Sequence, residues 1–299
     1  MQHLMLALFL GLSSAAWSMS AAGLALLAIG LAAAKRDFAQ ARGIDKVVAL
    51  TPVCLAVPLA VFGAEHFSMP QALLALVPRY MPWRIFWVYF VGVALMTAAL
   101  SIAVRRQVRW SGLLLGAMMF LFVAMLHLPG AIRAGGRVPW TIVFREMSFG
   151  GAGWVLAGTA WLADRDARGK AFLAVGRVAI AITAILFGVE HFLHPLGLPG
   201  VPLVKEMPGW VPLRPLIDYL TGAFEVLAGI GFLLSRNTRM AATYVGAWIV
   251  LLVLAIYGPV LLGALANPST GVQVEGLNYF ADTLLFGGAI LSLAGAVKK

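Results

Sequence analysis

The chain has 299 residues, of which 62% are apolar and only 11% are charged. Soluble domains carry about a quarter charged residues, so this composition excludes a soluble protein and predicts an integral membrane protein. The formal net charge of +10 does not indicate nucleic-acid binding, because the Lys and Arg residues are scattered in short loops and form no basic stripe.

Apolar runs long enough to cross a bilayer follow one another along the whole chain. Their length favours helices, since the strands of a membrane barrel would be about half as long. The predicted fold is therefore all-α and polytopic, with nine transmembrane helices. The first apolar run is not a signal peptide, because it is too long for one and no basic segment precedes it. In chain order, the predicted spans are 4–34, 47–67, 85–104, 112–132, 141–163, 172–193, 216–234, 240–265 and 277–297.

The distribution of basic residues predicts the orientation of the chain. Alternate loops hold 15 of the 22 Lys and Arg residues on one side and 7 on the other. The richer side is expected to be cytoplasmic. We therefore expect a multi-pass protein of the bacterial inner membrane, with its N-terminus outside and its C-terminus in the cytoplasm.

An internal repeat divides the chain. FGAEHFSMP at 62–70 recurs as FGVEHFLHP at 187–195, an offset of 125; further matches follow at offsets of 130 and 137. We predict an extra N-terminal helix and loop (1–46), a first four-helix unit (47–168) and a second (169–299). Because four is an even number, both units enter the membrane from the same side and run parallel.

The repeated motif places a Glu-His pair at the outer end of one helix in each unit: Glu65-His66 and Glu190-His191. Ionisable groups within spans are costly and are candidates for function. One interpretation is structural, with each group bonded to a neighbouring helix. The other is a proton-exchange site, since a His beside a carboxylate can titrate near neutral pH and serve a quinone headgroup.

Further residues could complete such a site. His127 and Glu225 lie on neighbouring spans at the same side of the membrane. The proline-rich outer loops carry aromatic residues that could shelter a quinone, although aromatic residues there also suit the headgroup belt; they are Trp83, Tyr89, Trp210 and Tyr219. A transition metal or haem is a less favoured alternative, with His66, His127, His191 and His194 as its ligands.

The two units differ at several aligned positions. His127 matches Tyr257 and Arg145 matches Asp282, while Glu146 matches Thr283 and Glu225 matches Leu95. One asymmetric site between the halves would produce this divergence.

The four-span unit resembles the DoxX-like group of bacterial membrane proteins, which includes DoxX, DoxD and MauE relatives. The first helix of each unit ends in an FG…F…P segment, a proline-containing outer loop follows, and Arg105-Arg106 and Arg236 lie between the second and third spans. The resemblance covers about 47–297 as two units. It departs where that group commonly has a Gly…Lys pattern, because Glu-His stands there in this chain.

The resemblance implies a role beside membrane redox enzymes, since members are associated with thiosulfate:quinone oxidoreductase and with maturation of periplasmic redox enzymes. We therefore favour an auxiliary or electron-transfer subunit with a periplasmic or membrane redox partner. Two alternatives remain: a permease for a small solute, and a non-catalytic scaffold or metal- or haem-binding protein.

Overall fold

The computed structural model describes residues 11–296. Nearly all of them lie in helices, and within this part of the chain the only β-type pairing is a single bridge between Gly197 and Glu206. The elements are α2 (Ser14–Gln40), α3 (Asp45–Ala49), α4 (Thr51–Ser68), α5 (Pro70–Leu74), α6 (Arg84–Ala103), α7 (Val108–Phe122), the π-helical turn η1 (Val123–His127), α8 (Leu128–Ala134), α9 (Arg137–Ala163), α10 (Arg168–Leu193), α11 (Arg214–Leu233), α12 (Thr238–Leu252), the π-helical turn η2 (Val253–Tyr257), α13 (Gly258–Leu265) and α14 (Thr270–Ala296).

The predicted all-α membrane fold is confirmed. Eight helical stretches within residues 11–296 are long and apolar enough to cross a membrane. The predicted span 141–163 corresponds to α9, which is as long as its neighbours but carries Arg137, Arg145 and Glu146. These charges explain why α9 is absent from the eight apolar stretches.

The helix α2 corresponds to the predicted span 4–34 over the residues that the structure describes and extends beyond its predicted end. It begins at Ser14 because Ser13 caps it: the hydroxyl of Ser13 accepts a hydrogen bond from the Ala16 N–H at 3.2 Å. It runs to Gln40 and so includes Lys35 and Arg36, whose long side chains can reach an interface from a helix end. Residues 4–10 of the predicted span lie outside the described residues.

Backbone features recur in the two units at the offset of 130. The π-helical turns occupy 123–127 and 253–257. Pro129 and Pro259 follow them, and a wider turn avoids the clash of a proline ring with the carbonyl four residues earlier. Trp83 and Leu213, which precede α6 and α11, are both left-handed, with φ of 49° and 51°. These matched irregularities support the predicted duplication.

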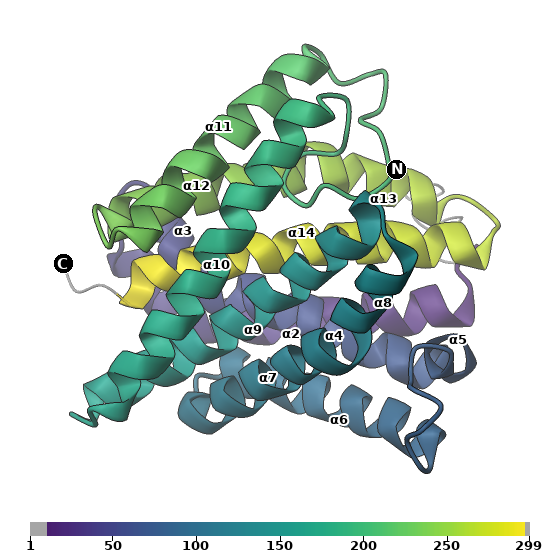
Figure 1. The fold of residues 1–299 in the computed structure, drawn as a ribbon, viewed down its shortest axis with the longest axis horizontal. Coiled ribbons are helices and arrows are strands. Elements are labelled where there is room, and N and C mark those ends of the chain that lie inside the picture. Colours follow the sequence, from purple (N-terminus) through teal and green to yellow (C-terminus); the bar gives the residue numbers. More distant parts are fainter. Residues whose placement is uncertain (1–10, 297–299) are drawn as a thin grey trace.

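The helices of the two units interlock. They pack in a ring in the order α4, α6, α7, α9, α10, α11, α12, α14 and back to α4, and α9 and α14 also meet inside it. Thus the fourth helix of each unit packs on the first helix of the other. Glycine permits the approach: a Cβ at Gly151 would meet the Gly176 carbonyl oxygen at 2.8 Å, and one at Gly288 would meet the Leu55 side chain at 2.9 Å. Figure 1 shows α14 crossing the middle of the bundle.

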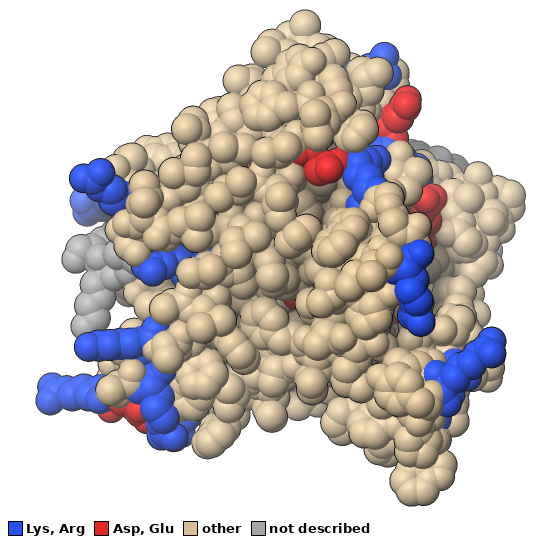
Figure 2. All heavy atoms as spheres, viewed as in Figure 1, with Lys and Arg blue, Asp and Glu red and all other residues tan. Residues whose placement is uncertain are grey.

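Charged side chains gather at the two ends of this bundle. Lys and Arg predominate at the end where α14 finishes, with few acidic side chains among them, whereas acidic and basic side chains mix more evenly at the opposite end (Figure 2). α4 and α10 both end at that mixed end (Figure 1), so the two Glu-His motifs lie at the same end of the molecule. The distribution of Lys and Arg predicts that this end faces outward, and we call it the outer end below.

Candidate functional site

A fully buried imidazole lies between two carboxyl groups at the outer end of the second unit. His191, in the last turn of α10, is 1% exposed, and Asp218 and Glu225 on α11 are 0% exposed. His191 Nδ1 lies 3.0 Å from Asp218 Oδ1, and Nε2 lies 3.7 Å from Glu225 Oε2. The two acids are seven residues apart, which places them on one face of α11 two turns apart. We call these three residues the His191 cluster.

A main-chain group determines which nitrogen of His191 carries the proton. The Gly200 N–H donates a hydrogen bond to Nε2 at 3.0 Å. Nε2 must therefore offer a lone pair, and the proton of the neutral ring lies on Nδ1, facing Asp218. Glu225 is left without a donor, because neither of its oxygens has a hydrogen-bond partner among the described residues.

The segment that supplies Gly200 folds into the bundle. It connects α10 to α11 over residues 194–213, and we call it the plug loop. Leu198, Val201 and Met207 are each 1% exposed, so the loop forms part of the core. Its apolar side chains fill space between the helices, and its Gly200 amide reaches His191.

Groups from several helices hold the plug loop by its carbonyl oxygens. The Tyr257 hydroxyl donates to the Pro199 oxygen at 2.9 Å, and Arg137 of the first unit donates to the Pro202 and Leu203 oxygens at 3.1 and 2.9 Å. These bonds satisfy backbone groups that are buried away from water. Side chains of both units therefore hold the plug loop in place over the His191 cluster.

The first unit has no equivalent cluster. His66 Nδ1 lies 2.7 Å from the Phe62 oxygen of its own helix, to which it donates. At the offset of 130, Val88 and Leu95 stand where α11 has its two acids. The motif therefore recurs, but of the two imidazoles only His191 has carboxyl groups within 4 Å.

A second set of polar side chains, centred on Arg145, joins the two units. This residue of α9 bonds to Asp282 of α14 at 2.7 Å and to its own neighbour Glu146 at 2.9 Å. Glu65 accepts a hydrogen bond from Asn278 of α14 at 3.1 Å. We call Arg145, Glu146 and Asp282 the Arg145 network.

The remaining predicted ligands lie apart from the His191 cluster. Glu190 is 3.7 Å from Arg137 and 3.6 Å from His194, on the half-exposed side of α10. His127 lies in η1, within electrostatic range of Glu146 rather than of His191. Residues 11–296 contain no group of three or more His, Cys, Asp or Glu side chains placed to hold a metal, so the four proposed histidine ligands do not meet.

The outer aromatic residues face away from the cluster. Trp83 and Trp210 are 80% and 56% exposed. Tyr89 stacks on Phe67, and Tyr219 stacks on Phe192, again as a matched pair. Their outward position is typical of the headgroup belt, and the role of these four side chains beside a ligand stays a prediction.

Sequence reasoning found His191 and Glu225 but did not assign a role to Asp218. The signal was present, since Asp218 and Glu225 stand seven residues apart on one apolar helix and so share a face. The contribution of Gly200 had no such signal, because only the folded loop brings its amide to the imidazole.

The fold and the composition define the class of protein: an integral, multi-pass membrane protein of α-helices. The family described as a domain of unknown function (DUF8561) matches residues 55–144, from within α4 to within α9. No curated protein matches the chain. No solved structure matches it either.

Proposed function

We propose that this chain is a proton-handling auxiliary subunit of a membrane redox system, with the His191 cluster as its proton-exchange site. One observation carries the proposal: Glu225 is fully buried, lacks a hydrogen-bond donor, and lies 3.7 Å from the one imidazole nitrogen that has a lone pair. Apart from the 3.0 Å contact with Nδ1, the oxygens of Asp218 lack a partner as well. Buried polar groups in native proteins are nearly always satisfied, so two such carboxyl groups at one imidazole mark a candidate functional site.

A proton arriving at Nε2 would change the contacts of the plug loop. Protonated Nε2 can no longer accept from the Gly200 N–H, and it becomes a donor to Glu225. Two buried carboxylates facing a neutral imidazole are poorly compensated, whereas an imidazolium between them is matched. Proton uptake at His191 therefore favours release of residue 200, and the loop position reports the protonation state.

The redox part of the proposal rests on the DoxX-like resemblance and on the place of the cluster. Oxidation of a quinol releases two protons with its two electrons; His191 and Glu225 would accept protons while the electrons pass to a partner protein. Because His191, Asp218 and Glu225 are fully buried beneath the plug loop, we expect a quinone-like ligand to reach the cluster only when the plug loop moves.

Infrared difference spectroscopy on the purified full chain in lipid nanodiscs tests this function. A protonated-carboxyl band should change with pH and on addition of a soluble quinol together with ferricyanide, which accepts the electrons in place of the partner protein. Glu225→Gln should remove both changes. Glu275→Gln is the matched control, because Glu275 is an exposed carboxylate that pairs with Lys205. A band that survives Glu225→Gln would refute the proton site; a pH response with no response to quinol would refute the redox role alone.

A further inference from the structure

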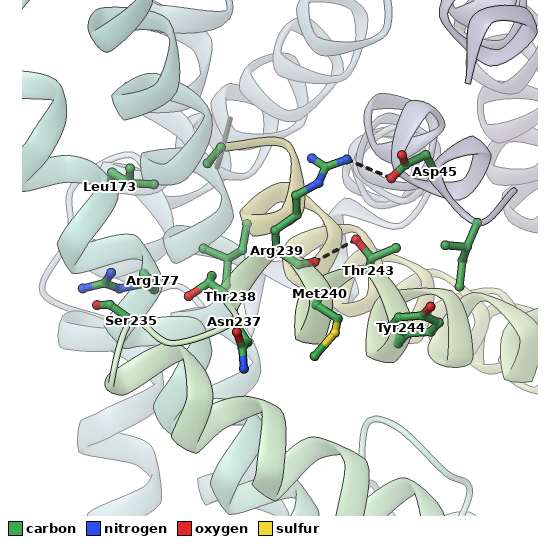
Figure 3. Close-up of a pocket in the computed structure, with 13 residues that line it drawn as sticks. Asp45, Leu173, Arg177, Ser235, Asn237, Thr238, Arg239, Met240, Thr243 and Tyr244 are labelled. Carbon is green, nitrogen blue, oxygen red and sulfur yellow. Dashed lines mark hydrogen bonds and ion pairs between the residues drawn. The ribbon is translucent and has the colours of Figure 1, made fainter. Parts of the chain in front are cut away.

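A pocket of about 510 Å³ opens at the basic end of the bundle, opposite the His191 cluster. It lies between α3, α10, α12 and α14. Figure 3 shows Arg177 beside Ser235 at one end of it and Arg239 reaching toward Asp45 at the other. The volume falls within the range of small-molecule sites.

The pocket contains a positive charge that no protein group balances. Arg239 bonds to Asp45 at 2.8 Å and to the Ala294 oxygen at 2.9 Å. Arg177, in contrast, has no hydrogen bond or ion pair with any residue of the part of the chain that the structure describes, and its Nε is buried. A buried guanidinium nitrogen without an acceptor is costly, so the site favours an anionic ligand.

The backbone adds further donors to the same place. α12 begins at Thr238, and no side chain caps it within residues 11–296. The first amide groups of a helix point outward and carry a partial positive charge, which suits phosphate. The hydroxyls of Ser235 and Thr238 also line the pocket.

Asn237 and Thr243 also line the pocket, but most of its remaining surface is apolar, and this favours one source of phosphate over another. Leu173, Met240 and Leu293 form much of the wall. A free phosphate would leave these side chains without a partner, whereas the glycerol and first acyl carbons of a lipid would cover them. Basic pockets between transmembrane helices bind anionic lipid headgroups in other membrane proteins.

The first unit does not repeat the charged lining of this pocket. At the offset of 125, Pro52 stands in the place of Arg177. Arg109, the counterpart of Arg239, is paired with Asp164 at 3.0 Å. The unbalanced charge is therefore a property of the second unit and not of the repeat.

We propose that this pocket binds the phosphate of an anionic phospholipid from the membrane leaflet at the basic end, with Arg177 and the N-terminus of α12 as its main donors. The phosphate accepts hydrogen bonds from both, and the glycerol backbone lies against the leucine-lined wall. This site is independent of the proton-exchange function.

Thermal unfolding of the purified full chain in detergent tests the site with three probes: phosphatidylglycerol, diacylglycerol and inorganic phosphate. Phosphatidylglycerol should raise the unfolding midpoint, and the other two at equal concentration should not. Arg177→Gln should weaken the apparent affinity by about tenfold, the effect of one charged hydrogen bond, and Arg177→Lys should retain part of it. Arg106→Gln removes the same charge from an exposed position at the same end and should change nothing.

Three results would overturn the proposal: an equal shift with inorganic phosphate, which would assign a free anion; an equal shift with diacylglycerol; and an equal loss in Arg106→Gln. Native mass spectrometry of the unaltered chain provides a second readout that does not depend on the variants. It should show one retained phosphatidylglycerol per chain and no retained diacylglycerol, and equal retention of the two would also refute the site.

Discussion

At the scale of single residues, neighbours decide what a repeated motif can do. His66 and His191 occupy the same place in the same nine-residue motif, yet one donates to its own helix and the other faces two carboxyl groups. The difference comes from α11, where Asp218 and Glu225 replace the apolar side chains of α6. The chemistry of each imidazole is therefore set by the helix it packs on.

Gly200 is the residue on which the tautomer of His191 depends. Its φ is +104°, a conformation that residues with a Cβ rarely adopt, and a Cβ there would lie 2.9 Å from Thr283 Cγ2. We expect Gly200→Ala to lower the free energy of unfolding by about 1–3 kcal/mol and to displace the amide from Nε2.

Gly209→Ala is the control for this prediction. Gly209 lies in the same loop, and a Cβ there would meet nothing within 4 Å. Chemical denaturation of the full chain in detergent measures both variants. Equal stability of the two would show that the plug loop does not depend on the geometry of Gly200.

At the scale of helices, the first and second helices of each unit pack closely through glycine, but with different tolerance. A Cβ at Gly188 would lie 2.6 Å from the backbone oxygen of Gly222. A Cβ at Gly63 would lie 2.8 Å from the flexible side chain of Met96 and 3.2 Å from the Gly92 oxygen. A backbone oxygen can make room for an added Cβ only if its helix moves, whereas a Met side chain can change rotamer.

We therefore expect unequal effects from the same substitution in the two units. Gly188→Ala should lower the free energy of unfolding by about 1–3 kcal/mol through overpacking between α10 and α11. Gly63→Ala should cost less, because only Met96 has to move. Each variant serves as the control of the other in a thermal unfolding experiment, and a larger effect at Gly63 would contradict the prediction.

At the scale of the whole molecule, the Arg145 network lies where the two units meet. Arg145 and Asp282 are aligned positions of the repeat, at the offset of 137, and they are bonded to each other. A residue can contact its own counterpart only close to the axis that relates the two copies. This contact supports an axis running between α9 and α14, with one charge of each sign beside it.

Removal of Arg145 should destabilise the molecule more than removal of Asp282. Arg145→Met leaves two buried carboxyl groups without their cation, at a cost of about 3–5 kcal/mol. Asp282→Leu leaves Arg145 still bonded to Glu146, so its cost should be smaller. Lys205→Met, which breaks a partly exposed pair, should cost less than about 1 kcal/mol. Denaturant titration gives all three values, and equal effects of Arg145→Met and Lys205→Met would exclude a structural role for the network.

Composition and hydrophobic runs alone determined the class of this protein and the helices that build it. A chain with so few charged residues cannot form a water-soluble surface. In lipid a helix makes all its backbone hydrogen bonds internally, so length and apolarity suffice to place α4, α6, α10 and α11. The repeat was also readable, because matched residues at constant offsets need no coordinates.

Only the tertiary structure decided which polar residues meet. His191 lies 27 residues from Asp218 and 34 from Glu225 along the chain, and its contact with them depends on the packing of α10 against α11. The position of the plug loop could not be predicted for the same reason: an apolar, proline-rich sequence suits a membrane surface and a protein core equally well. What separates the two environments is the space that neighbouring helices leave, and that space is a property of the assembled bundle.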